Sequence, residues 1–117
     1  MKSQHPPLTR IQYAEEKFSD AVRLFATQPG DVRSRLYAAC CAFGTVQLED
    51  LPANLRRDFR WIKRMVTRRE PRWISKGVII DGSLKASLQQ MQNRTGSKIA
   101  VRVWKIAEVL RNLTLVK

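Results

Sequence analysis

Histidine and cysteine are scarce in this chain of 117 residues, which has one histidine and two cysteines. His5 stands in a polar N-terminal stretch beside two prolines, so the side chain that enzymes use most often as a general base is missing from the expected core. Cys40 and Cys41 are adjacent and have neither a histidine partner nor the spacing of a metal site. We expect both to be buried helical thiols. We expect no metal, no cofactor and no enzymatic activity.

Long apolar runs are also missing. No stretch approaches the roughly 18 consecutive apolar residues that a membrane-spanning helix needs, and residues 1–7 lack the apolar segment of a secretion signal. There is no glycine-rich loop of the nucleotide-binding kinds. Two cysteines and no export signal favour a reducing compartment. We therefore expect a cytoplasmic protein with no membrane contact and no small-molecule substrate.

Acidic residues are the third shortage. The chain has 10 Asp and Glu against 22 Lys and Arg, which leaves a formal net charge of +12. A content of 44% hydrophobic and 27% charged residues is ordinary for a globular domain and argues against a disordered basic tail. So much positive charge on a small compact body repels itself, which indicates a polyanionic partner.

Apolar residues recur at steps of three and four, which is the pattern of amphipathic helices. Pro29-Gly30 ends the first predicted helix, and Asp31 is placed to cap the second. Gly44 suits a left-handed stop for the second helix, and Pro71 stops the third. The predicted helices span residues 11–27, 32–43, 52–68, 83–91 and 97–112.

These helices predict an all-α fold, a compact single-domain bundle of about five helices with an irregular segment at about 70–82. Within that segment, residues 78–80 fit either a short strand before a turn or an extended loop that fills the core. We expect residues 1–8 to be a flexible lead and residues 9–117 to form the domain.

The third predicted helix is the most basic part of the chain. On a helical wheel Leu55, Phe59, Ile62 and Val66 share one sector, while arginines and lysines cover the opposite side. Trp61 lies outside the apolar sector, among arginines. An aromatic ring flanked by arginines is typical of single-stranded nucleic-acid sites, where bases stack on the ring. Three alternatives stay open: a merely solvated basic face, a Trp61 packed under a neighbouring segment, and an arginine stacked on Trp61 within the monomer.

A second basic element begins at a predicted turn, residues 93–96. Thr95 or Ser97 would cap the following helix, Gly96 would allow a close approach, and the helix start would favour an anion, although ordinary capping explains the pattern equally well. The helix then carries a basic stripe and, off its core face, Trp104. The helix–turn–helix outline of residues 83–112 lacks an Asn/Gln set for base reading, so we expect backbone contacts to outweigh base contacts.

The sequence therefore predicts a small basic helical protein that binds DNA or RNA chiefly through phosphates, with Trp61 and then Trp73 as candidates for base stacking. The alternative is a protein–protein module or small subunit of a nucleoprotein complex, whose arginine-rich face docks an acidic partner or a second copy through Trp61 or Trp104. The predicted nucleic-acid-binding residues are Arg56, Arg57, Arg60, Trp61, Lys63, Arg64, Arg68, Arg69, Arg72, Trp73, Lys76, Arg94, Lys98, Arg102 and Lys105.

Overall fold

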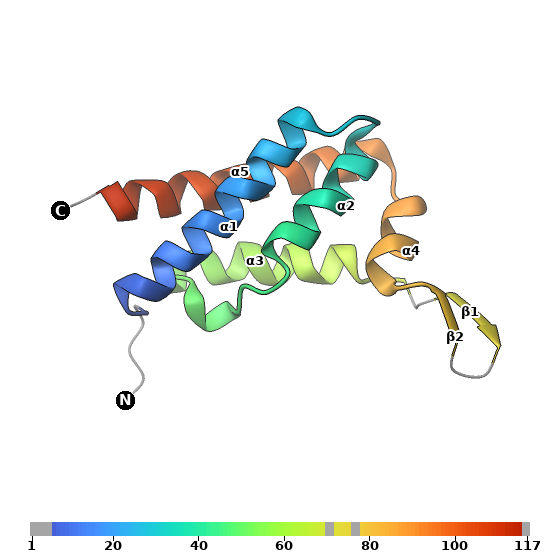
Figure 1. The fold of residues 1–117 in the computed structure, drawn as a ribbon, viewed down its shortest axis with the longest axis horizontal. Coiled ribbons are helices and arrows are strands. Elements are labelled where there is room, and N and C mark those ends of the chain that lie inside the picture. Colours follow the sequence, from blue (N-terminus) through green and yellow to red (C-terminus); the bar gives the residue numbers. More distant parts are fainter. Residues whose placement is uncertain (1–5, 70–71, 76–77, 116–117) are drawn as a thin grey trace.

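The computed structural model describes the backbone of residues 6–69, 72–75 and 78–115, and the side chains of residues 6–69 and 82–115. Within these residues it confirms the predicted bundle of five α-helices, joined by a short 3₁₀ helix and a two-stranded hairpin (Figure 1). The elements are α1 Leu8–Thr27, α2 Val32–Phe43, η1 Leu48–Asp50, α3 Ala53–Val66, β1 Arg72–Ser75, β2 Val78–Asp81, α4 Ser83–Gln89 and α5 Asn93–Leu115.

The long helix α5 holds the bundle together. It contacts α1, α2 and α3, while α1 and α2 pack side by side across it (Figure 1). The short helix α4 contacts α2 and α3 and leads into α5. In the part of the chain that the structure describes, no helix is both long enough and apolar enough to cross a membrane.

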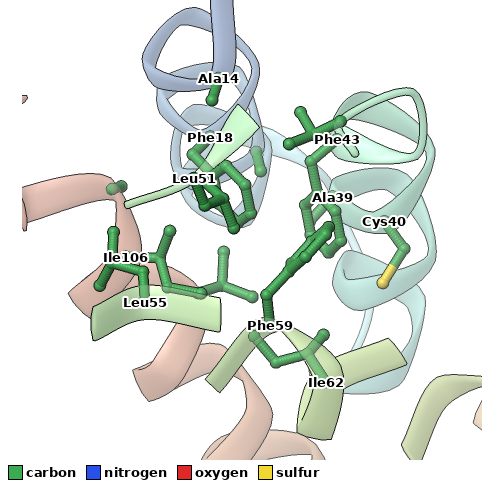
Figure 2. Close-up of a cluster of buried hydrophobic side chains, with 14 of the residues drawn as sticks. Ala14, Phe18, Ala39, Cys40, Phe43, Leu51, Leu55, Phe59, Ile62 and Ile106 are labelled. Carbon is green, nitrogen blue, oxygen red and sulfur yellow. The ribbon is translucent and has the colours of Figure 1, made fainter. Parts of the chain in front are cut away.

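Three phenylalanines from three helices form the centre of the core (Figure 2). The rings of Phe18 and Phe43 stack with centroids 4.8 Å apart, and Phe59 packs edge-on against both. The apolar positions predicted for α3 are all buried, and so are most of those predicted for the other helices. The periodicity of three and four residues therefore identified the core-facing sides correctly.

The turn between α1 and α2 matches its prediction. Gly30 has a φ of 98°, a left-handed conformation that glycine adopts without strain. The carboxylate of Asp31 accepts hydrogen bonds from the N–H groups of Arg33 and Ser34 at 3.0 and 3.2 Å, and so caps α2. The predicted left-handed stop at Gly44 was wrong, because Gly44 follows α2 with a helical φ of −61°.

The end of α3 and the start of α1 both differ from the predicted helix boundaries. The helix α3 ends at Val66 and not at Arg68; the hydroxyl of Thr67 donates to the carbonyl of Lys63 at 2.6 Å, a side-chain bond that competes with the helical pattern. The helix α1 begins earlier than predicted, at Leu8, because Pro7 needs no N–H at a helix start and its carbonyl accepts the first helical bonds.

The helix α5 also begins earlier than predicted. Residues 93–96 are its first turn and not a separate one, since the carbonyl of Gln92 already accepts a bond from the N–H of Gly96 at 3.0 Å. Thr95 and Ser97 therefore lie inside the helix and do not cap it. Gly96 is buried against α2, where an added Cβ would lie 3.0 Å from the side chain of Val32. Because Gly96 has no side chain, α5 and α2 can approach each other closely. Gly96 does not provide the close approach of an anion that the sequence predicted.

The segment predicted as irregular holds the hairpin. Strands β1 and β2 pair antiparallel, with Trp73 opposite Ile79, and irregularities interrupt the register on both sides of that pair. Residues 78–80 thus adopt the strand alternative. The hairpin projects from the bundle beside α4, which β2 contacts (Figure 1).

Candidate nucleic-acid interface

The outer face of α3 presents a row of unpaired arginines. Arg57, Arg60 and Arg64 are exposed, and none of them forms a hydrogen bond or ion pair with a described residue. Steps of three and four residues separate neighbours in this row by about 4.5–6 Å along the helix axis. Arg68 continues the row just past the helix end and is likewise exposed and without such a partner. The guanidinium groups are therefore open to an anion from solvent.

The other basic residues near α3 are more constrained. Arg56 is half-buried, and its Nε donates to the carbonyl of Leu51 at 3.0 Å. The ammonium group of Lys63 lies 5.0 Å from the centre of the Phe59 ring, at the edge of the core. The backbone N–H of Arg69 donates to the buried hydroxyl of Ser87 at 2.9 Å, which ties the end of α3 to α4 while the Arg69 side chain stays exposed.

A single acidic residue joins the α3 face to the stripe on α5. Asp58 accepts a hydrogen bond from Arg102 at 3.1 Å, and its second oxygen lies 3.2 Å from the ammonium group of Lys105. The Asp58 side chain is 16% exposed, against 40% for Arg102 and 60% for Lys105. Because the two helices also pack together, the two predicted basic stripes lie next to each other. Lys98 and Arg94 extend the α5 stripe toward the helix start, and both are exposed.

Trp61 lies at the same junction. Its side chain is half-buried and packs against the core, and the guanidinium carbon of Arg102 lies 4.0 Å from the ring centre. An arginine stacked on Trp61 within the monomer, one of the alternatives left open by the sequence, is therefore the arrangement in the structure. Asp58 holds that same arginine, so carboxylate, guanidinium and indole form one unit between α3 and α5.

The sequence reasoning missed Asp58. No role is predicted for this residue from the sequence, whereas the structure pairs it with two cations 44 and 47 positions further along the chain. A partial signal was available: Asp58 and Trp61 are three residues apart and therefore share one flank of α3. Nothing in the local pattern indicates that α5 would supply the partners.

Three predicted site residues receive no side-chain description. The backbones of Arg72 and Trp73 belong to β1, but their side chains lie outside the described part of the chain. Lys76 lies outside the described residues altogether. Their predicted contacts with nucleic acid stay predictions.

Trp104 lies on another side of α5. At 3.6 residues per turn it is about 160° around the helix from Arg102. It is 55% exposed and, with Val101, lines a groove of about 540 Å³ that Val22 and Phe25 of α1 complete. An exposed tryptophan beside an exposed aliphatic side chain is a feature of protein interfaces.

The two cysteines differ. Cys40 is buried in the core, and burial raises the pKa of its thiol to about 12. Cys41 is exposed, so the expectation of two buried thiols was wrong for it: Cys41 points about 100° away from Cys40 around the helix, which places it outside the core-facing side of α2. Among the described residues, no three histidine, cysteine, aspartate or glutamate side chains gather as a metal site would require.

Comparison with known proteins gives no match: no family model, no curated protein and no solved structure matches this chain.

Proposed function

We propose that this protein is a non-enzymatic nucleic-acid-binding protein that contacts the phosphate backbone through α3 and α5. The observation that carries the proposal is the junction at Asp58, which brings the unpaired arginines of α3 next to the lysines and arginines of α5. Adjacent rows of cations suit an extended polyanion better than a single small anion. We place this activity in the cytoplasm, where the free thiols of Cys40 and Cys41 would stay reduced.

The energetic basis is counterion release. Each phosphate that a lysine or arginine neutralises on duplex DNA contributes a slope of about −0.9 to log K against log salt. Arginine also binds phosphate through two parallel N–H bonds, and arginine outnumbers lysine in this surface. Four unpaired arginines on or just after α3, together with Lys98 and Arg94, predict about six contacts and a slope near −5.

The test is charge reversal on α3 with a matched control. Arg57→Glu with Arg64→Glu removes two unpaired cations from the middle of the surface. Arg23→Glu with Arg111→Glu changes two exposed arginines that line a separate pocket between α1 and α5. Both double variants lower the formal charge by the same four units, so net charge alone affects them equally.

Binding is measured by fluorescence anisotropy with labelled DNA and RNA at several salt concentrations, and folding by circular dichroism. We expect the α3 variant to lose binding by at least a hundredfold while the control loses much less. Equal losses would show that overall charge, and not the α3 surface, causes binding. Unchanged binding by a folded α3 variant would remove α3 from the site.

A protein partner is a second candidate, and the exposure of Trp104 beside Val101 favours it. In this interpretation the protein is a small subunit of a nucleoprotein complex. An acidic segment of the partner would dock on the arginines, while a separate apolar side chain of the same partner would insert beside Trp104 on another side of α5. The probe is a labelled peptide that alternates glutamate with leucine. Binding that Trp104→Ala weakens, while nucleic-acid binding is unchanged, would support a separate protein surface; no binding of the peptide would argue against it.

A further inference from the structure

One face of the Trp61 ring is covered by the guanidinium group of Arg102. Arg102 lies over the ring at 4.0 Å, and Asp58 holds Arg102 through an ion pair of 3.1 Å. A base that stacked on this face of the ring would have to displace the guanidinium group and leave Asp58 with Lys105 alone. The best aromatic candidate in the basic surface is therefore not an open platform for a base.

The other described aromatic side chains do not replace it. Phe18, Phe43 and Phe59 form the buried centre of the core. Trp104 is open but lines the groove against α1 and α2 together with Phe25, about 160° around α5 from Arg102. Tyr37 is exposed but lines a pocket between α2 and α4, and the hydroxyl of Tyr13 on α1 is hydrogen-bonded to Thr45, so neither belongs to the α3 and α5 rows. Among the side chains that the structure describes, the basic surface thus has no open ring. Proteins that bind single strands without sequence preference depend on such rings, because bases stack on them.

What this surface does offer is two adjacent rows of cations on packed helices. The packed helices α3 and α5 carry these rows, and the Asp58 ion pairs link the two helices. A single strand presents one flexible row of phosphates, whereas a double helix presents two rows across a groove about 6 or 12 Å wide. A rigid pair of cation rows matches the second arrangement.

Counterion release favours the same ligand. The slope per phosphate contact is about −0.9 for duplex DNA and about −0.7 for single strands. For six contacts at 0.1 M salt this difference amounts to about 16-fold tighter binding of the duplex. Stacking would have to compensate for that factor, and the described part of the surface has no open ring to provide it.

We propose that the ligand is a double helix, DNA or RNA, held along its sugar–phosphate backbone, and that Trp61 positions Arg102 instead of stacking on a base. This inference rests on the proposed function, because it names the substrate class of the same surface. Trp61→Phe keeps a ring under Arg102, whereas Trp61→Leu removes it.

The experiment titrates the whole protein against four labelled probes: a 20-nucleotide DNA strand, the same strand as RNA, and the 20-base-pair DNA and RNA duplexes. Anisotropy is measured from 50 to 200 mM salt. We expect at least one of the two duplexes to bind about tenfold tighter than the single strands. Trp61→Leu should change the affinity for every bound probe by the same factor, and Trp61→Phe should bind each probe as the original protein does.

The possible outcomes test the duplex inference and the proposed nucleic-acid binding separately. Single strands that bind as tightly as duplexes, with a loss on Trp61→Leu confined to single strands, would overturn the duplex inference and leave nucleic-acid binding standing. Single strands that bind as tightly as duplexes, without any effect of Trp61→Leu, would also overturn it, and would direct attention to Trp73. Failure to bind any probe at 50 mM salt would overturn the proposed function itself.

Discussion

Replacing Asp58 by asparagine should loosen the fold slightly and strengthen polyanion binding. The substitution keeps the size of the side chain and one hydrogen-bond acceptor, but it removes the charge that Arg102 and Lys105 share. Both cations are substantially exposed, and exposed pairs contribute only about 0.2–1 kcal/mol each. We therefore expect a loss of about 1 kcal/mol in unfolding free energy, or about 4 °C in Tm for a chain of this size.

The effect on binding has the opposite sign. The variant removes one negative charge from the centre of the proposed surface and releases two cations. Each released cation that gains a duplex phosphate should steepen the salt slope by about 0.9 and raise affinity about eightfold at 0.1 M salt. The assay is fluorescence anisotropy at several salt concentrations, combined with thermal unfolding of the same preparations.

Asp20→Asn is the matched control. It raises the formal charge by the same unit, but Asp20 lies on α1 and, among the described residues, pairs only with the exposed Arg23 at 3.4 Å. We expect it to change affinity by less than about twofold, because charges further apart than the Debye length of about 10 Å at 0.1 M are largely screened. If both variants gain affinity and slope equally, Asp58 does not restrain cations that belong to the binding surface. A weaker-binding Asp58→Asn would refute the reasoning as well.

Two further predictions concern the fold. Asp50 is buried and accepts bonds from Arg10 at 2.8 Å and from the Gln47 N–H at 2.9 Å. Asp50→Ala should therefore lower the unfolding free energy by about 2–3 kcal/mol, measured by urea denaturation. A loss below about 0.5 kcal/mol would mean that solvent replaces both partners. At pH 8 a thiol reagent should label Cys41 rapidly and Cys40 only after unfolding, because burial raises the Cys40 pKa to about 12. Labelling is measured by mass spectrometry. Labelling of both cysteines in the native protein would contradict the buried position of Cys40.

The core of this protein was predictable from its sequence because burial follows a local rule. Leu55, Phe59, Ile62 and Val66 recur at helical spacing, and all four are buried in α3. Asp31 caps α2 because its carboxylate, at the residue before the helix, accepts bonds from first-turn N–H groups. The charge balance was equally visible and led to the hypothesis of a polyanionic partner, which stays a proposal.

The start of α5 was not predictable in the same way. Residues 93–97 contain asparagine, threonine, glycine and serine, which are typical of turns, yet they are helical. The buried position of Gly96 against Val32 explains this, because packing between α5 and α2 outweighs the weak local preference for a turn. Only the folded neighbour makes a small residue favourable at that point.

The sequence by itself determined which faces are apolar, how many helices form and how much positive charge the surface carries. The tertiary structure decided which of those charges are free, because Asp58 neutralises Arg102 and Lys105 only once α3 and α5 pack together. It also decided that the Trp61 ring carries an arginine. Periodicity is a property of neighbouring residues in the chain, whereas an ion pair or a stacked ring depends on side chains about 40 residues apart reaching the same point in space.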